Sequence, residues 1–255
     1  MIKIADENFN IERYINDLSV ADPFGCRIKS LYATYSYNLP FVDFWVEFVN
    51  EKYVSLIARL ESVFILRLTD DSDIEEISSF LRVSGASSII CDGKYELQVN
   101  LKRTDGPILV RNSPFQLTRN FDVITPTVKD IYFVIDKCKS DNFSVPSYED
   151  FALDVTHKLN SKTIRMFGIS NGIVLQSCIM TLAESEDCAV LGALATLPNF
   201  RSCGFGSHLI KYITNKLIAE NKSVYLHRAK TENIEFYKKS GFEEYGIWAE
   251  YSIED

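Results

Sequence analysis

The stretch Pro198-Asn-Phe-Arg201-Ser-Cys-Gly204-Phe-Gly206-Ser207 decides how this 255-residue chain is interpreted. A nearly all-apolar run, 188–197, precedes it, which suits a strand covered on both faces. Apolar residues then recur at helical spacing, at Leu209, Ile210, Ile213, Leu217 and Ile218. The stretch is therefore expected to turn a strand into a helix. A helix start exposes unpaired N–H groups and a partial positive charge, and the glycines leave room, so this turn can cradle a pyrophosphate.

Two other interpretations of the glycines remain open. Gly204 and Gly206 can merely shape a tight turn, because short glycine motifs recur by chance. A dinucleotide-binding Rossmann turn fits less well, since Leu209 stands at the third glycine position and no acidic residue lies on a clear following strand at the ribose position.

The composition is that of an ordinary soluble globular protein, with 46% hydrophobic and 24% charged residues and a net charge of -8. No basic footprint suggests a nucleic-acid partner. No apolar stretch approaches the roughly 20 residues that span a bilayer, and the start lacks a signal-peptide pattern. We expect a cytoplasmic protein with no membrane or nucleic-acid partner.

Cysteine and histidine spacing predicts neither disulfides nor a metal site. The six cysteines contain no Cys-x-x-Cys pair and are expected to be reduced. His157, His208 and His227 have no ligand spacing with each other or with the cysteines.

The C-terminal half predicts the element order α-α-β-β-β-loop-α-β-α-β. Helices are expected over 127–141 and from Ser147 onward, each opened by a capping-box pattern. Asn171-Gly172 between apolar runs predicts a hairpin. The remaining expected elements are strands over 163–170, 173–183, 188–197, 223–227 and 242–253, and a short helix over 233–239.

The N-terminal half repeats part of this order. Extended segments are expected at Phe41–Val49, at Tyr53–Leu68 and at 87–91, with a helix between the last two. A capping box at Ser72–Glu75 opens that helix and Gly85 ends it. These segments are one strand short of the β-β-β-α-β order of the C-terminal half, which we expect to occur twice in the chain. Residues 97–126, which contain three prolines, are expected to hold closing strands and a linker.

Two motifs together resemble the GNAT superfamily of N-acetyltransferases. Arg201-x-x-Gly204-x-Gly206 is similar to its Q/R-x-x-G-x-G/A loop. The segment from Asn233 through Phe236-Tyr237 to Gly241-Phe242 looks like its N-x-x-F-Y-x-x-x-G-F segment. The resemblance covers 123–255, whereas the first half matches only in element order.

This resemblance implies an α/β fold with mixed, mostly antiparallel sheets flanked by helices, arranged as two tandem GNAT-like halves. Residues 1–122 would form a degenerate GNAT-like domain without a coenzyme A (CoA) loop. Residues 123–255 would form the acyl-CoA-binding catalytic domain. In this family acyl-CoA threads into a V-shaped opening between two splayed central strands.

The resemblance also implies which residues bind acetyl-CoA. Arg201 would border the loop, and Lys238 or Lys239 could approach the adenosine phosphate, although both also suit a solvated surface. The pyrophosphate would take the backbone amides of Ser202, Cys203, Gly204, Phe205, Gly206 and Ser207. The pantetheine arm would pair with backbone groups of Ala195 and Leu197 and with Asn233.

Tyr237 is the residue that the resemblance implies for chemistry. By itself it suits an aromatic that packs with Phe236 on a helix. In many GNAT members a tyrosine at this position lies near the thioester sulfur, where a phenol can protonate the leaving thiolate. Cys203 could have a lowered thiol pKa at a helix start, but no His or Asn partner is evident, and a small loop residue is expected.

No general base can be identified from the sequence. The run 188–197 contains no acid. Glu184, Glu186 and Asp187 are expected at a solvated hairpin tip. The remaining candidates are Glu149, Asp150 and His227, and a chain of water molecules could replace a nearby carboxylate.

The corresponding junction of the first half, Leu68–Glu76, differs in charge. It contains no glycine and five carboxylates, which favour a helix start but repel a pyrophosphate. We therefore expect no CoA in the first half. It could instead cover the acceptor site, widen the sheet or form a dimer contact.

Three function classes follow. The first is an N-acyltransferase that moves an acetyl or other acyl group from CoA to a small-molecule or peptide amine by direct attack. The second is a non-catalytic module that senses acyl-CoA or binds a partner with the same fold. The third is a structural or interaction protein that binds no nucleotide.

Overall fold

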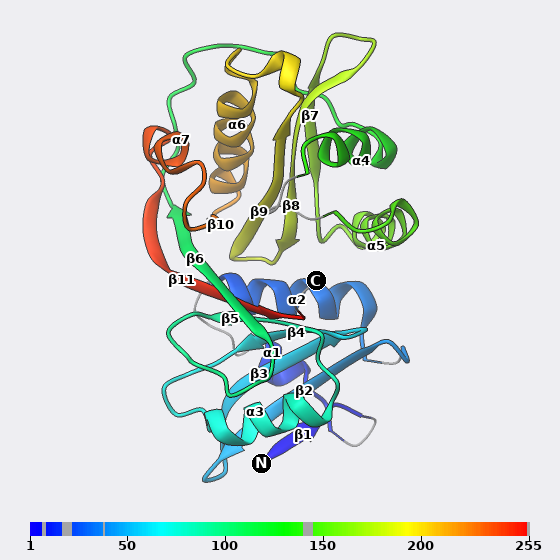
Figure 1. The fold of residues 1–255 in the computed structure, drawn as a ribbon, viewed down its shortest axis with the longest axis vertical. Helices are drawn as coiled ribbons and strands as arrows, with labels where there is room; N and C mark the ends of the chain where they lie inside the picture. Colours follow the sequence, from blue (N-terminus) through cyan, green and yellow to red (C-terminus); the bar gives the residue numbers. More distant parts are fainter. Residues whose placement is uncertain (7–8, 17–21, 38, 140–144, 254–255) are drawn as a thin grey trace. The chain divides into compact units, whose positions relative to one another are not determined.

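The computed structural model describes residues 1–6, 9–16, 22–37, 39–139 and 145–253 (Figure 1). These form two compact units. The first contains residues 1–108 and 244–255, and the second contains residues 109–243. No described helix is long and apolar enough to cross a membrane.

The first unit is a mixed sheet with helices on both faces. Neighbouring strands run in the order β1-β2-β3-β4-β5-β11-β6, and of the described pairings only β4–β5 is parallel. The strand β6 (Lys102–Arg111) begins in this unit and ends in the second. The other elements are β1 (Ile2–Ile4), α1 (Glu12–Asn16), α2 (Pro23–Tyr35), β2 (Val42–Val49), β3 (Lys52–Leu60), β4 (Val63–Arg67), α3 (Ile74–Val83), β5 (Ser88–Asp92) and β11 (Glu243–Ser252).

Side-chain alternation along β2 builds two cores in this unit. Phe44 and Val46 pack with α2, whereas Trp45 packs with α3. Successive side chains of a strand point to opposite faces, so α2 and α3 lie on opposite faces of the sheet.

The second unit has the strand order β10-β9-β8-β7, in which only β9–β10 is parallel among the described pairings. Figure 1 shows α6 on one face of this sheet and α4 with α5 on the other. The elements are α4 (Val128–Lys137), α5 (Tyr148–Asn160), β7 (Met166–Ser170), β8 (Leu175–Glu184), β9 (Cys188–Thr196), the 3₁₀ turn η1 (Pro198–Phe200), α6 (Phe205–Ala219), β10 (Ser223–His227) and α7 (Ile234–Lys239).

Local sequence signals explain the helix starts and the hairpin of this unit. Thr127 and Asp130 form a reciprocal capping box on α4, and the Ser147 side chain accepts from Asp150 N on α5. Gly172 has φ 86°, and Asn171 Oδ1 accepts from Ile173 N and Val174 N, so the predicted Asn-Gly turn is confirmed. The end of the predicted helix 127–141 lies partly outside the described residues.

The internal repeat is confirmed and is longer than predicted. Each unit contains a helix pair, three antiparallel strands, a helix and a parallel strand: α1-α2-β2-β3-β4-α3-β5 matches α4-α5-β7-β8-β9-α6-β10. Neither α1 nor α2 was predicted from the sequence. The single extended segment predicted over 53–68 is two strands, β3 and β4, separated by a turn at Glu61 with φ 55°.

The start of α3 also differs from the prediction. Asp73, not Ser72, is the N-cap, and its side chain accepts from Glu76 N at 2.9 Å. Ser72 instead accepts from Thr69 N and contacts the Ser55 hydroxyl.

The compact units differ in two places from the predicted division into 1–122 and 123–255. Residues 109–122 lie in the second unit. The final strand, β11, lies in the first unit from Glu244 onward, where Ala249 pairs with Cys91 and Tyr251 pairs with Ile89. Buried Ala249 and Tyr251 join the core around α3, so apolar burial explains where this strand lies.

Candidate active site

The turn between β9 and α6 has the backbone of an anion cradle. Ser202 and Gly204 have φ of 63° and 90°, and Gly204 is the N-cap of α6 without any side-chain cap. The helical hydrogen bonds begin at His208 N, which donates to Gly204 O at 3.0 Å. The N–H groups of Phe205, Gly206 and Ser207 therefore have no acceptor within the helix. They can donate to an oxyanion ligand.

Two arginines border this turn. Arg119 Nη1 donates to Cys203 O at 2.9 Å, and Arg201 Nε donates to Thr196 O at 3.2 Å. Arg119 lies in the segment predicted to be a linker, and nothing in its sequence surroundings indicated a role. With two guanidiniums and a helix N-terminus, the turn favours an anion.

The two central strands separate next to this turn. The parallel pairing of β9 with β10 runs from Cys188↔Ser223 to Leu191↔Leu226, whereas β9 continues to Thr196. Gly192 faces Met180 and Ala195 faces Cys178, so β9 carries one extra residue here, at Ala193, whose φ is 49°. This bulge bends β9 where its pairing with β10 ends.

Ala195 and Leu197, whose backbone groups were predicted to pair with a pantetheine arm, pair with β8 instead. Leu197 N donates to Gln176 O at 3.0 Å, and Ala195, two residues before it, faces Cys178, so both residues direct their backbone groups toward β8. Leu194 and Thr196 therefore direct theirs toward the open edge.

Gly206 lies beside this open edge. A Cβ atom on Gly206 would come within 3.4 Å of Thr196 Oγ1 and 3.8 Å of Leu194 Cδ1. The helix start and the free strand edge are thus adjacent parts of one site.

Asn233 begins α7 without capping it through its side chain. It has φ 56°, and its carbonyl accepts from Tyr237 N at 3.1 Å. The side chain is exposed and forms no hydrogen bond with any described residue, so it is available to a ligand.

Tyr237 packs as an aromatic, as predicted, and its role in chemistry stays a prediction. Its half-buried ring packs against Phe236, with centroids 5.0 Å apart, and against Phe242, 6.4 Å apart. Burial raises the pKa of Tyr237 to about 12, although the Arg228 charge opposes this shift. The phenol is therefore protonated near neutral pH, and within the described parts of the chain it forms no hydrogen bond.

Arg228 orders the loop that leads to α7. It is buried, and its Nη1 donates to Ala229 O at 2.8 Å, to Lys230 O at 3.0 Å and to Glu232 O at 3.2 Å. Arg228 could not be predicted from the sequence, because its partners are backbone carbonyl groups and no pattern of side chains indicates them.

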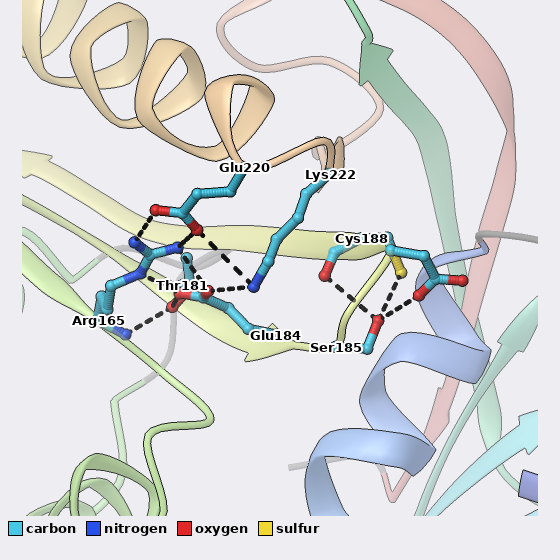
Figure 2. Close-up of polar contacts among 8 residues, drawn as sticks. Arg165, Thr181, Glu184, Ser185, Cys188, Glu220 and Lys222 are labelled. Carbon is cyan, nitrogen blue, oxygen red and sulfur yellow. Dashed lines mark hydrogen bonds and ion pairs between the residues drawn. The ribbon is translucent and has the colours of Figure 1, made fainter. Parts of the chain in front are cut away.

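Glu184 is not at a solvated tip, as was predicted, but is buried at the end of β8 with 7% exposure. Its carboxylate pairs with Arg165 at 2.7 Å and with Lys222 at 3.0 Å (Figure 2). Thr181 Oγ1 also donates to it, at 2.9 Å. Since these partners already use its oxygens, Glu184 is a structural residue and not an available base.

The other acids that were considered as bases lie at a helix start or in the turn after β8. Glu149 and Asp150 are exposed in the first turn of α5, where Ser147 donates to the Asp150 carboxylate at 2.7 Å. Asp187 accepts from Ser185 at 2.6 Å, and Glu186 is exposed.

The junction between β4 and α3 in the first unit already contains an acidic side chain of the chain itself. Asp73 N donates to Glu47 Oε1 at 2.9 Å, and Ser55 Oγ donates to Glu47 Oε2 at 2.5 Å. Glu47 is fully buried, and burial raises its pKa despite these two donors. A carboxylate thus lies at the start of α3, at the position where the equivalent junction of the second unit is open.

The described residues contain no group of three or more His, Cys, Asp or Glu side chains that could hold a metal ion.

Known proteins resemble this chain in part of its sequence and in its fold. Residues 166–253 match the family described as FR47-like protein. No curated protein matches the sequence.

Three solved structures match nearly the whole chain. A GNAT-family acetyltransferase from Colwellia psychrerythraea has 11% identity and a TM-score of 0.57, with 100% of both chains covered. A tandem GNAT protein from the clavulanic acid biosynthesis pathway has 11% identity and a TM-score of 0.58, with 98% of each chain covered. A Drosophila protein has 9% identity and a TM-score of 0.66, with 99% of this chain and 98% of that chain covered.

The chain therefore has the mixed α/β fold of the GNAT acetyltransferases, as its two motifs predicted. Over nearly its whole length this is the fold of a tandem GNAT protein, and its C-terminal part is FR47-like in sequence.

Proposed function

We propose that this protein is an acyl-CoA-dependent N-acyltransferase with one cofactor site, located in the second unit. The observation that carries the proposal is the uncapped start of α6 beside the free edge of β9. Arg119 and Arg201 add positive charge to a backbone cradle suited to the CoA pyrophosphate. The cradle is formed by residues 202–207.

The pantetheine arm would run along the open edge of β9. Backbone groups of Leu194 and Thr196 point there, and the exposed amide of Asn233 is available to the same arm. Arg201 Nε now donates to Thr196 O, so its side chain would shift when the arm binds. The thioester would lie near the bulge at Ala193, because β9 and β10 are paired only as far as Leu191 and Leu226 and separate beyond them.

The proposed reaction is direct transfer. The lone pair of a neutral amine attacks the thioester carbonyl, the new C–N bond forms and the C–S bond breaks. The departing thiolate takes the Tyr237 phenolic proton, and the amine nitrogen loses its extra proton to solvent, from which the phenol regains one. Tyr237 suits this role because its raised pKa keeps the phenol protonated near neutral pH, so that it can donate to the departing sulfur.

A non-catalytic acyl-CoA-binding module is the second candidate. It is favoured by one observation, namely that Glu184, an acid on the strand next to β9, is already bound by Arg165 and Lys222. This candidate predicts CoA binding without turnover.

The test is a pair of measurements on the purified protein. Acetyl-CoA should raise its melting temperature. At a concentration of 100 times Kd, it should add about 2.7 kcal/mol to the free energy of unfolding. Free-thiol release should then appear with some members of a panel of small amines, polyamines, amino acids and peptides. Binding without release for any acceptor would support the non-catalytic module, and no binding would contradict both candidates.

A cytoplasmic location and a small-molecule or peptide amine acceptor remain part of the proposal. The location is supported by the six cysteines, all of which are free thiols. The acceptor class has only the mild support of the acidic net charge of -8, which suits a cationic amine.

A further inference from the structure

The second unit contains an apolar cavity of about 260 Å³ between the α4–α5 pair and the sheet. Its walls include Ile135 from α4, Phe151 and Val155 from α5, Met180 and Leu182 from β8, and Ala193 from β9. The motifs and the cofactor loop do not use this cavity.

The charged groups of the cavity are paired with each other. Asp154 and Lys158 line it one helical turn apart on α5, and their charged atoms are 2.6 Å apart. A cavity whose charges are already neutralised in this way favours an uncharged, apolar occupant, because an ionic group would lose hydration without gaining a new partner.

The cavity adjoins the bulge at which the central strands separate. Ala193 is both the bulged residue and a cavity wall. Leu182 packs over Gly192, where an added Cβ would lie 2.5 Å from Leu182 Cδ1. A thioester at this level of β9 would therefore have the cavity beside its acyl group, on the sheet face that α4 and α5 cover.

The volume suits one group of a substrate. Pockets for whole drug-sized ligands begin at about 300 Å³. An apolar cavity of roughly 150 Å³ is enough for benzene. The cavity here lies between these sizes, so it accommodates a tail of about six carbons.

We propose that this cavity binds the apolar tail of an acyl group longer than acetyl, so that the preferred donor is a medium-chain or ring-bearing acyl-CoA. This inference rests on the acyltransferase function proposed above. The bond changes are the same as for acetyl transfer, and the tail takes no part in them. It adds binding energy that positions the carbonyl carbon at the bulge.

The test is a series of straight-chain acyl-CoA donors from acetyl to octanoyl with one fixed amine. If each methylene enters the cavity, kcat/KM should rise about threefold to fourfold per carbon up to about hexanoyl and then level off. A flat or falling series from acetyl onward would overturn the inference.

Two variants test whether the cavity causes this preference. Val155→Phe adds a ring to the cavity wall, so hexanoyl transfer should fall at least tenfold while acetyl transfer changes less than twofold. Leu153→Phe is the matched control, because Leu153 lies on the same helix but is 64% exposed and does not line the cavity. It should leave the chain-length series unchanged.

Val155→Ala provides a second measurement in case the larger side chain prevents folding. It enlarges the cavity and should shift the preferred donor by one or two carbons toward octanoyl. An unchanged preference in both variants would overturn the inference, even if the wild-type protein prefers long chains.

A CoA binding measurement separates this inference from the proposed function. If the wild-type protein neither binds CoA nor turns over any acyl-CoA, the proposed function itself is contradicted. Normal CoA binding with acetyl as the best donor would contradict only the cavity inference. If Val155→Phe instead changed the size preference for the amine, with the donor series unaffected, the cavity would bind the acceptor and the inference would be wrong.

Discussion

At the residue scale, Tyr237 has two environments. Its ring is held by Phe236 and Phe242, whereas its hydroxyl has no hydrogen-bond partner among the described residues. Packing therefore involves the ring, whereas the proposed chemistry involves the hydroxyl. A substitution that keeps the ring and removes the oxygen can separate them.

We expect Tyr237→Phe to lower kcat by about 10²-fold, the lower end of general acid catalysis, without weakening CoA binding. The measurements are thiol release at saturating substrate and a CoA-induced shift in melting temperature. The control is Tyr245→Phe, which removes the same oxygen from an exposed tyrosine. Equal turnover in Tyr237→Phe and wild type would exclude the proposed acid.

The same side chain predicts a pH effect on stability. Burial raises the folded-state pKa of Tyr237 to about 12, above the unfolded value near 10. Between these values the folded state retains a proton that the unfolded state has lost, so the free energy of unfolding falls as pH rises from 10 to 12. In the Tyr237→Phe protein, the free energy of unfolding should fall less between pH 10 and pH 12. Urea titrations across that range measure it. Identical alkaline profiles would contradict the raised pKa.

At the element scale, the start of α6 depends on a residue that tolerates positive φ. Gly204 has φ 90°, and an added Cβ would lie 3.0 Å from Arg119 Nη1. Gly172 in the β7–β8 hairpin has nearly the same φ, 86°, but nothing within 4 Å of an added Cβ. The two glycines thus share a backbone requirement and differ only in their surroundings.

We expect Gly204→Ala and Gly172→Ala each to cost about 1–2 kcal/mol of unfolding free energy, because both place a Cβ in the left-handed region. Only Gly204→Ala should also weaken CoA binding, since it displaces the cradle and Arg119. Urea melts and calorimetric CoA titrations measure the two effects. Equal CoA affinity in the two variants would argue against a cofactor role for this turn.

The charge network around Glu184 connects elements of the second unit. Arg165 precedes β7, Glu220 ends α6 and Lys222 precedes β10, and the buried Glu184 carboxylate binds both cations (Figure 2). Removing it would leave the two cations with Glu220 alone, which is 2.7 Å from Arg165 and 4.0 Å from Lys222.

Glu184→Ala should therefore lower the unfolding free energy by about 1–3 kcal/mol, because the buried donors of Thr181, Arg165 and Lys222 lose an acceptor while Glu220 still pairs with the two cations. Glu186→Ala, at an exposed acid two residues later, should change it by less than about 0.5 kcal/mol. Denaturant unfolding measures both variants. A small effect of Glu184→Ala would mean that water solvates the site.

At the scale of the whole molecule, two similar strand-to-helix junctions differ in whether an anion can enter. The junction at α6 is open and bordered by arginines, whereas buried Glu47 already lies at the start of α3. We therefore expect one CoA per chain in a calorimetric titration. A stoichiometry of two would contradict the role assigned to Glu47.

Local patterns were sufficient for much of the fold and for the centre of the site. Asn171-Gly172, the caps at Thr127 and Ser147, and the glycines of the α6 turn act through neighbouring atoms in the chain, so the sequence by itself determined them. The same is true of the contrast in charge between the two junctions.

Contacts between distant segments could only be decided by tertiary structure. Arg119, Arg228 and Glu47 act on backbone groups that the fold brings to them, and no spacing in the sequence encodes that proximity. The bulge at Ala193 shifted the free backbone groups from Ala195 and Leu197 to Leu194 and Thr196. Burial of Ala249 and Tyr251 likewise placed the last strand with the first unit, since apolar side chains pack where the core is and not where the chain order suggests.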